Sequence, residues 1–294
     1  MPIACEFEYH KPKTLKEALA LLARHKGKLQ PLAGGTDLIV WLKEGVRSPE
    51  HVMDLKALPL GGIQKKGDAV RIGALTTFAE LIESPLIREK FPVLWEAARS
   101  VASTGVRNRA TLAGNLCSAV PCMDSAPPLL VYDAVVELQG PKKTRELPLE
   151  KFFKGPKKTA LAPDELLVAV RLPLPVGKAG GAYLKLGRYR GEDLAQVGLA
   201  VLALPGEWRL AWGAVGPVPT RSHLIESLLA GKKLSPELLR EAGRLVANEI
   251  APITDIRSSK EYRLHMAGVM LERGLKAAAE RQAGRGPAAG ESLL

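Results

Sequence analysis

Hydrophobic residues recur along the chain in two patterns, short apolar runs and the three-to-four-residue spacing of amphipathic helices. The apolar runs predict strands over 6–10, 29–33, 51–55, 69–72, 131–138, 166–172, 182–186, 196–204 and 208–215. The helical spacing predicts helices over 15–22, 38–42, 77–81, 92–103, 221–229, 235–248 and 258–279, with Thr14, either Thr76 or Thr77, and Ser235 as N-caps. We therefore expect a chain that mixes helix and sheet throughout.

A proline-rich segment interrupts this pattern. Pro173-Leu174-Pro175-Val176-Gly177 stands between two predicted strands, and prolines disfavour the continuation of either one. Because 294 residues suffice for about two domains, we expect one domain over 1–175, with parts near 1–55 and 56–175, and a second over 178–280. Residues 281–294 are rich in Gly, Pro and Ala and are expected to form a flexible tail.

Composition and charge exclude several classes of protein. Hydrophobic residues at 46% and charged residues at 25% are typical of globular chains. No apolar run reaches about 18 residues, so we expect no membrane span and a cytoplasmic protein. The net charge of +11 suggests nucleic acid, but the lysine doublets are scattered and aromatic residues make up only 5%, so no nucleic-acid partner is predicted. The basic excess is read as a solvated surface or a face for an anionic ligand or acidic partner.

Neither the cysteines nor the histidines predict a metal site. Cys5, Cys117 and Cys122 contain no Cys-x-x-Cys pair, so reduced thiols are expected. The histidines show no i, i+4 pair with an acidic partner and no ligand triplet along the sequence, so we assign no metal to them. They are His10, His25, His51, His223 and His265.

The first motif with ligand-binding chemistry is Gly34-Gly35-Thr36-Asp37, which follows a predicted strand and precedes a predicted helix. Glycines there let backbone N–H groups approach a phosphate without a Cβ in the way. The motif has neither the G-x-G-x-x-G fingerprint nor the Gly-Lys-Ser/Thr of a Walker loop. Two interpretations stay open: a phosphate-binding turn, and a plain strand-to-helix turn in which Thr36 or Asp37 only caps the helix.

The second motif covers residues 106–124, which combine small, polar and glycine residues with little charge after Arg109. Thr111, Gly114 and Asn115 repeat the chemistry of the first motif. The Asp124 carboxylate suits a sugar hydroxyl, because it would repel a pyrophosphate. This composition predicts a close-packed ligand wall, and the two motifs together suggest an extended dinucleotide.

Five segments of the sequence resemble segments of a known protein family. They are PLAGGTDLIVWLK (31–43), IGALTTFAEL (72–81), VRNRATLAGNLCSAVPCMDSAPPLLVYDA (106–134), YRGEDLAQVGLAV (189–201) and DIRSSKEYRLHMAGVMLERGL (255–275). In this order they resemble the FAD-binding medium subunit of molybdenum hydroxylases, a family that includes carbon monoxide dehydrogenase, xanthine dehydrogenase and 4-hydroxybenzoyl-CoA reductase. The resemblance implies an α+β fold, with a two-part FAD-binding domain of the vanillyl-alcohol-oxidase/p-cresol-methylhydroxylase type and a smaller α+β C-terminal domain.

The resemblance also implies which residues bind FAD. The residues that would wrap the pyrophosphate are Leu32, Ala33, Gly34, Gly35, Thr36, Asp37 and Leu38. Those that would continue around the phosphates and the flavin are Thr111, Gly114, Asn115 and Ser118, with Asp124 on a sugar hydroxyl. The apolar neighbours would be Val101, Ala102, Val106, Cys117 and Leu167, and the matching basic residue is Lys185. Packing is the favoured role of the Cys117 side chain, and non-covalent FAD is expected because the motifs offer no tether.

The chain departs from the family pattern Gln-Ile-Arg-Asn-Arg-Gly-Thr-Ile-Gly-Gly-Asn at Gly105, Val106, Ala110 and Ala113. Ala113 puts a methyl group where the family has a glycine, which weakens the expected backbone contact there. Only Cys122 lies near the position of the cysteine-rich insertion of the benzoyl-CoA reductase branch. No iron–sulfur cluster is therefore expected in this chain.

Two further segments have alternative interpretations. Residues 189–193 are either a mobile loop near the flavin or a plain turn between domains. Asp255, Arg257 and Arg263 are expected to anchor the last helix through ion pairs.

Three functions are compatible with the sequence. The resemblance favours an FAD-binding electron-transfer subunit, which passes electrons between the iron–sulfur clusters of a partner and an external acceptor and needs no catalytic side chain of its own. Its expected partners are a molybdopterin-binding large subunit and a small subunit with 2Fe–2S clusters, in a dimer of heterotrimers. The alternatives are a standalone FAD-dependent oxidoreductase with its own small organic substrate, and a non-enzymatic nucleotide-binding scaffold.

Overall fold

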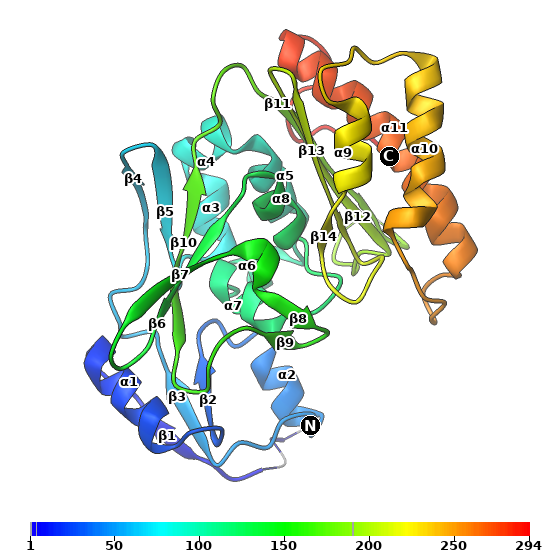
Figure 1. Ribbon diagram of the computed structural model, residues 1–294. Coiled ribbons are helices and arrows are strands. Elements are labelled where there is room, and N and C mark those ends of the chain that lie inside the picture. Colours follow the sequence, from blue (N-terminus) through cyan, green and yellow to red (C-terminus); the bar gives the residue numbers. More distant parts are fainter. Residues whose placement is uncertain (1, 4, 190) are drawn as a thin grey trace.

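The computed structural model describes residues 2–3, 5–189 and 191–294 (Figure 1). Its larger elements form three groups, each built on one sheet. A small parallel sheet lies at the end that contains the N-terminal residues, a five-stranded sheet lies in the middle, and a four-stranded sheet carries the C-terminal helices. Among the described residues, no helix combines the length and apolarity that crossing a membrane requires.

The N-terminal group is a parallel sheet with helices on its connections. Its elements are β1 (Glu8–His10), α1 (Leu15–Arg24), β2 (Leu29–Leu32), α2 (Leu38–Lys43) and β3 (His51–Asp54), with the strand order β1-β3-β2. The Thr14 hydroxyl accepts a hydrogen bond from the Glu17 backbone N–H, as expected of the N-cap of α1. The connection between β2 and α2 is the glycine motif, so this group brings that motif to the carboxyl end of β2.

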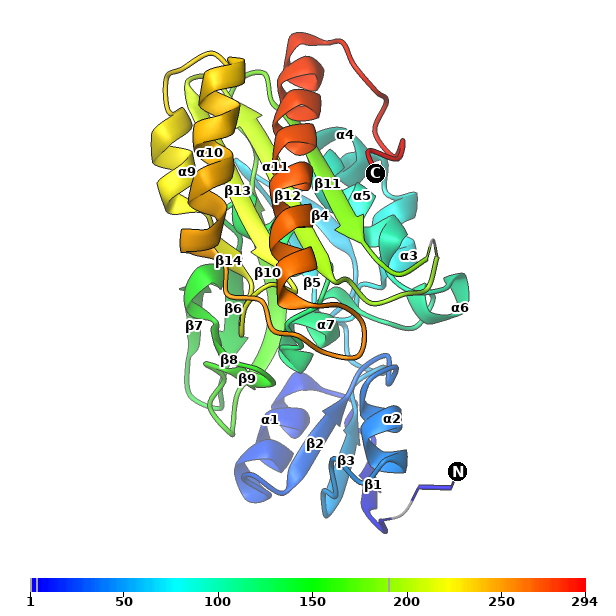
Figure 2. The ribbon, with the colours of Figure 1, turned by 90° about the vertical axis from the view of Figure 1, so that its right-hand side faces the viewer.

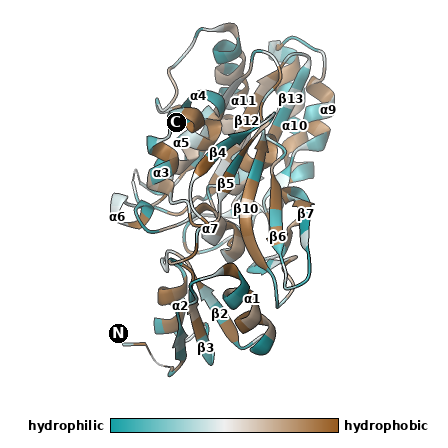
Figure 3. Ribbon diagram, turned by 90° about the vertical axis from the view of Figure 1, so that its left-hand side faces the viewer, coloured by the Kyte–Doolittle hydropathy of each residue, from teal (hydrophilic) through white to brown (hydrophobic). Residues whose placement is uncertain are grey.

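The middle group is an antiparallel sheet in the order β4-β5-β10-β6-β7, covered by short helices. Its strands are β4 (Ile63–Lys66), β5 (Ala69–Gly73), β6 (Val135–Gln139), β7 (Thr144–Pro148) and β10 (Leu166–Pro173), beside the small hairpin β8 (Phe153–Gly155) and β9 (Lys158–Thr159). Its helices are α3 (Phe78–Glu83), α4 (Pro85–Lys90), α5 (Pro92–Ser100), α6 (Thr104–Arg107), α7 (Leu112–Ser118), α8 (Ala126–Val131) and the 3-10 turn η1 (Leu149–Lys151). Hydrophobic colouring follows the central strand β10, whereas the edge strand β7 is hydrophilic (Figure 3).

The C-terminal group is a second antiparallel sheet between two layers of helices. Its elements are β11 (Gly180–Leu186), β12 (Val197–Leu204), β13 (Glu207–Gly213), β14 (Thr220–Arg221), α9 (His223–Leu229), α10 (Pro236–Glu249) and α11 (Lys260–Ala283). Helices α9, α10 and α11 cover one face (Figure 2), and α5 and α8 of the middle group contact the other. A Cβ on Gly180 would lie 2.1 Å from the Gln282 backbone nitrogen, so α11 packs on β11 at a distance that only glycine allows.

The structure corrects several predicted boundaries. The strand expected over 131–138 is wrong in its first part, because α8 continues to Val131 and the strand begins only at Val135. Val131 and Tyr132 are buried on all sides, so an apolar run there does not distinguish a helix from a strand. The helix expected over 92–103 ends at Ser100, and the motif at 106–124 contains the helix α7.

The expected ion-pair anchor of the last helix is confirmed. The Arg263 guanidinium lies 2.7 Å from an Asp255 oxygen, and Arg257 pairs with the same carboxylate at 3.2 Å. Arg263 is buried and also donates to the backbone oxygens of Gln196 and Ala214. The anchor therefore fixes the start of α11 against the sheet.

The last residues differ from the expected flexible tail. The Arg281 guanidinium lies 2.9 Å from the buried Glu96 carboxylate of α5, and the Gly290 N–H donates to the same carboxylate at 2.7 Å. Leu293 and Leu294 pack against the hydrophobic core of the C-terminal group. The sequence of this segment has little hydrophobic pattern and did not reveal these contacts. Two of the three are made by the charged Arg281 side chain and by the Gly290 backbone, which a hydrophobic pattern does not report.

Candidate functional site

A cavity of about 560 Å³ lies where the three groups meet. Its walls come from the β2–α2 connection, α7, the residues after α5, β10 and β11. Every residue that the sequence analysis assigned to FAD lines this cavity, with the exception of Leu32. The Leu32 carbonyl instead accepts a hydrogen bond from the Leu55 N–H, so this residue completes the sheet behind the wall.

The glycine motif forms a cradle at the carboxyl end of β2. A Cβ on Gly34 would lie 1.9 Å from the Arg109 carbonyl oxygen, so the motif packs directly on the backbone of the second motif. Gly35 has a φ of +80°, which favours glycine. Among the hydrogen bonds between described residues, the N–H groups of residues 34–37 donate none. These donors are left for a ligand, and Asp37 makes no side-chain capping bond to α2.

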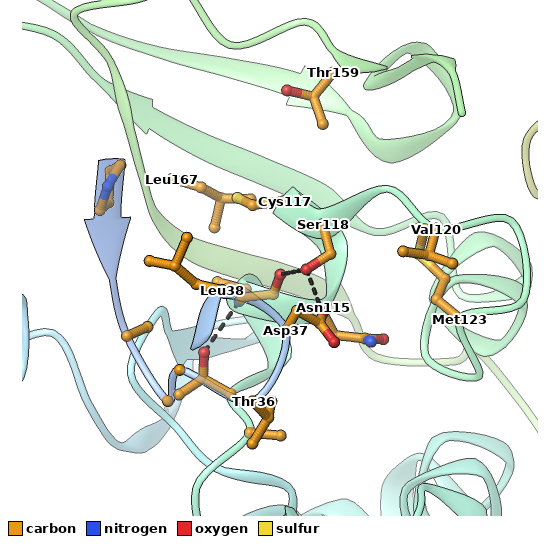
Figure 4. Close-up of a pocket in the computed structure, with 18 of the residues that line it drawn as sticks. Thr36, Asp37, Leu38, Asn115, Cys117, Ser118, Val120, Met123, Thr159 and Leu167 are labelled. Carbon is orange, nitrogen blue, oxygen red and sulfur yellow. Dashed lines mark hydrogen bonds between the residues drawn. The ribbon is translucent and has the colours of Figure 1, made fainter. Parts of the chain in front are cut away.

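Helix α7 presents the second motif to the same cavity. Thr111 caps the helix by accepting a hydrogen bond from the Gly114 N–H at 3.0 Å. The Ser118 hydroxyl donates to the Asp37 carboxylate and so joins the two motifs, 81 positions apart in the sequence (Figure 4). Asn115 accepts a bond from the Ser125 hydroxyl at 2.6 Å, which fixes the orientation of its amide. The two motifs are thus one wall, as the sequence suggested.

Asp124 lies at the end of the cavity beside β11. Lys185 Nζ lies 2.8 Å from one Asp124 oxygen, and the Tyr183 hydroxyl donates to the other at 2.8 Å. Burial raises the pKa of Asp124, while the Lys185 ammonium and the Tyr183 hydroxyl act in the opposite direction. Lys185 also donates to the Ser100 carbonyl, so this cluster ties the C-terminal sheet to the end of α5.

The rest of the lining near α7 is apolar. Val101, Ala102 and Val106 come from the turn between α5 and α6, and Leu167 comes from the bulge in β10. Burial raises the pKa of the Cys117 thiol to about 12, so the thiol is protonated at neutral pH. This agrees with a packing role for Cys117.

Sequence reasoning missed a cationic corner of the cavity. The charged groups of Arg47 and Lys157 each lie 5.5 Å from the centroid of the Trp41 indole ring of α2. All three residues line the cavity, and so does Thr159 in the neighbouring hairpin. The string 31–43 contains Trp41 but gives no sign of its partners, since Arg47 and Lys157 meet it only in the tertiary structure.

A loop from the C-terminal group covers part of the cavity. Glu192, Asp193 and Leu194 line it, whereas Arg190 of the segment 189–193 lies outside the described residues. The Asp193 carboxylate is buried and pairs with Arg188 at 3.0 Å. Hydrogen bonds from the Arg188 side chain and backbone lower the pKa of Asp193 to about 2.

We expect the Arg188–Asp193 pair to be lost in acid. The folded-state pKa of Asp193 is depressed, so its contribution to stability is present above its unfolded pKa of about 4 and disappears as the pH falls towards about 2. The free energy of unfolding, measured with urea between these pH values, should therefore fall less steeply with decreasing pH for Asp193→Asn than for the unmodified chain. Equal slopes for the two proteins would contradict this assignment.

The structure brings three of the five histidines close together. No ligand triplet was expected, but His10, His25 and His51 bring one ring nitrogen each within 4.8 Å of one another. The sequence did not reveal this, because the three belong to separate elements that only the parallel sheet brings together. None of the described residues that line the cavity is a histidine.

Comparison with known proteins identifies the family. Residues 5–175 match the model of the FAD binding domain in molybdopterin dehydrogenase, and residues 182–278 match that of the CO dehydrogenase flavoprotein C-terminal domain. The chain is 36% identical to the putative xanthine dehydrogenase FAD-binding subunit of Escherichia coli (strain K12), over 94% of this chain and 97% of that protein. It is 36% identical to the carbon monoxide dehydrogenase medium chain of Hydrogenophaga pseudoflava, over 92% of this chain and 96% of that one.

A solved structure agrees with these matches. The carbon monoxide dehydrogenase of Hydrogenophaga pseudoflava that lacks the Mo-pyranopterin moiety superposes with a TM-score of 0.90 at 35% identity, over 94% of this chain and 98% of that one. The chain therefore belongs to the family of FAD-binding medium subunits of molybdenum-containing dehydrogenases. It is an oxidoreductase subunit with FAD as its cofactor, which confirms the family predicted from the sequence.

Proposed function

We propose that this chain holds FAD non-covalently in the cavity and passes electrons between the iron–sulfur clusters of a partner subunit and an external acceptor. Bound FAD supplies the redox chemistry, since it accepts and donates electrons. The protein supplies orientation, exclusion of water and electrostatics. No described side chain is needed as acid, base or nucleophile in this role.

The unused N–H groups of residues 34–37 are the observation that carries the proposal. Backbone donors without partners suit an anion, and the Gly34 contact with Arg109 holds them in a fixed position. Residues 33–38 would therefore hold the pyrophosphate, with Leu32 behind them in the sheet. Thr111, Gly114, Asn115 and Ser118 would extend this surface towards the flavin, because α7 is joined to Asp37 by Ser118.

The remaining lining residues have complementary roles. Val101, Ala102, Val106, Cys117 and Leu167 would pack on apolar parts of the FAD. We propose that the Asp124 carboxylate accepts a hydrogen bond from a sugar hydroxyl of FAD. Its oxygens can do so while the carboxylate stays paired with Lys185. Lys157 and Arg47 at Trp41 offer positive charge near the same wall, which suits a ligand with two phosphates.

The proposed assembly follows the relatives. The partners would be a large subunit with molybdopterin and a small subunit with 2Fe–2S clusters, arranged as a dimer of heterotrimers. We further propose that residues 1–175 form a two-part FAD domain of the vanillyl-alcohol-oxidase/p-cresol-methylhydroxylase type and that 178–280 form the second domain. One hydrophobic core consists only of residues after β10, which supports a division between β10 and β11, while the other core also contains residues from one face of β11, β12 and β13.

Titration of the flavin-free chain with FAD and with FMN tests the proposal. FMN lacks the adenylate half, so a site built for the whole dinucleotide should bind FAD about 100-fold more tightly, or roughly 3 kcal/mol. Flavin fluorescence and the visible spectrum report the binding. Equal affinity for both flavins would show that the adenylate half is not held, and a folded chain that binds neither would overturn the proposal.

A further inference from the structure

Three histidines from separate elements meet on one face of the N-terminal sheet. His10 is the last residue of β1, His25 is the C-cap of α1, and His51 is the first residue of β3. Their ring nitrogens all lie within 4.8 Å of one another, and none of the three rings is fully exposed. The cluster lies outside the lining of the cavity, so FAD binding does not explain it.

The register of the parallel sheet places a carboxylate beside these rings. Glu8 is paired with His51 and His10 with Met53, so Glu8, His10 and His51 share one face of the sheet. A Glu8 oxygen lies 3.3 Å from His51 Nδ1, and the other lies 3.8 Å from His10 Nε2. The three imidazoles thus form one cluster, and the Glu8 carboxylate lies beside two of them, His10 and His51.

The spacing of these atoms suits a tetrahedral cation. His10 Nε2 and His51 Nδ1 are 3.1 Å apart. Two ligands of a tetrahedral Zn²⁺ at 2.0–2.1 Å from the metal are separated by about 3.4 Å. Imidazole nitrogen and carboxylate oxygen are both ligands that Zn²⁺ accepts, and four protein ligands are typical of a structural zinc site.

The backbone holds the third histidine over the sheet. The His25 N–H donates to the Leu21 carbonyl, and the His25 carbonyl accepts bonds from the N–H groups of Lys28 and Leu29. Helix α1 packs on the same face through Leu19 and Leu22, which share a core with Met53. The His25 ring itself makes no hydrogen bond with any described residue, so both of its nitrogens are available.

We propose that His10, His25 and His51, with Glu8 as the fourth ligand, bind one Zn²⁺ ion. The ion would link the end of α1 to β1 and β3. Because the four ligands leave no open position for substrate, its role would be structural. It would stabilise the group that carries the glycine motif without contacting FAD.

Metal titration of the full chain, without a histidine tag and after treatment with a chelator, tests this proposal. Co²⁺ serves as a coloured probe of tetrahedral coordination, and Zn²⁺ should displace it. We expect one equivalent of Zn²⁺ per chain by elemental analysis and a higher Tm with the metal than without it. Loss of a residue that only hydrogen-bonds to a metal ligand already lowers metal affinity by about tenfold or more, and loss of the ligand itself should lower it at least as much. We therefore expect His25→Asn to weaken Zn²⁺ binding by at least about tenfold.

Two matched variants separate this site from adventitious binding. His265→Asn changes an exposed histidine of α11 and should bind Zn²⁺ as the unmodified chain does. Cys5→Ser removes the thiol of the N-terminal segment and should also leave the affinity unchanged. Zn²⁺ binding that survives His25→Asn and His51→Asn, or no saturable binding by the folded chain, would overturn the proposal. Neither result bears on FAD binding, which is measured separately by flavin fluorescence.

Discussion

Gly34→Ala is expected to weaken FAD binding by at least about 100-fold, or roughly 3 kcal/mol. The new methyl group would lie 1.9 Å from the Arg109 oxygen, 2.6 Å from the Arg109 carbonyl carbon and 3.0 Å from the Ala110 Cα. All three atoms belong to the backbone, so no side-chain rotation can relieve the contact. The variant is measured by FAD fluorescence titration, with far-UV circular dichroism to establish that it folds.

The new methyl group should displace the glycine motif rather than the opposite segment, because two hydrogen bonds hold residues 110–112 against residues 76–78. The Phe78 N–H donates to the Ala110 carbonyl, and the Leu112 N–H donates to the Thr76 carbonyl, both at 3.0 Å. A shift of the motif moves the N–H groups that we assign to the pyrophosphate. The loss should therefore appear in FAD affinity as well as in stability.

Gly243→Ala in α10 is the matched control. A Cβ at Gly243 meets nothing within 4 Å, and alanine favours helix by about 1 kcal/mol over glycine. This variant should keep the FAD affinity and gain slightly in stability. The opposite outcome is a folded Gly34→Ala protein that binds FAD within about threefold of the unmodified chain, a difference of less than about 1 kcal/mol. That result would exclude the glycine motif as the pyrophosphate site.

Lys185→Met is expected to lower the free energy of unfolding by about 3–5 kcal/mol at neutral pH. Only 11% of the Lys185 side chain and 9% of the Asp124 side chain are exposed, so the substitution leaves a buried carboxylate without its cation. It also leaves the Ser100 carbonyl without the Lys185 donor. Urea unfolding measures the loss.

The effect of Lys185→Met should become smaller as the pH falls. Burial already raises the pKa of Asp124, and removal of Lys185 raises it further. A carboxyl group whose folded pKa lies above its unfolded value favours the folded state at low pH and loses this contribution as the pH rises through the folded pKa. The difference from the unmodified chain should therefore be less at about pH 5 than at about pH 7.

Two further proteins control this experiment. The double variant Asp124→Asn/Lys185→Met removes the uncompensated charge and should recover at least half of the lost stability. Lys276→Met breaks the ion pair between Lys276 and Glu272, in which both side chains are more than half exposed. It should lower the free energy of unfolding by less than about 1 kcal/mol. If Lys185→Met costs no more than Lys276→Met, the buried pair does not stabilise the fold.

Much of the site could be predicted from the sequence because its chemistry is local. The glycines of residues 34–35, the cap Thr111 and the small residues of α7 each satisfy a backbone requirement that neighbouring residues define. The amphipathic spacing of α1 and α10 likewise agrees with the faces that these helices bury. Where a segment is buried on all sides, as at Val131 and Tyr132, the apolar pattern carries no period and the predicted strand was wrong there.

By itself the sequence determined the mixture of helix and sheet, the two glycine-containing motifs and, through its motifs, the family. The tertiary structure alone decided which distant groups meet. It joined Ser118 to Asp37, paired Lys185 with Asp124 and Arg281 with Glu96, and gathered three histidines on one face of a parallel sheet. The physical reason is that such contacts depend on strand order and register between segments far apart in the chain, and no local spacing encodes them.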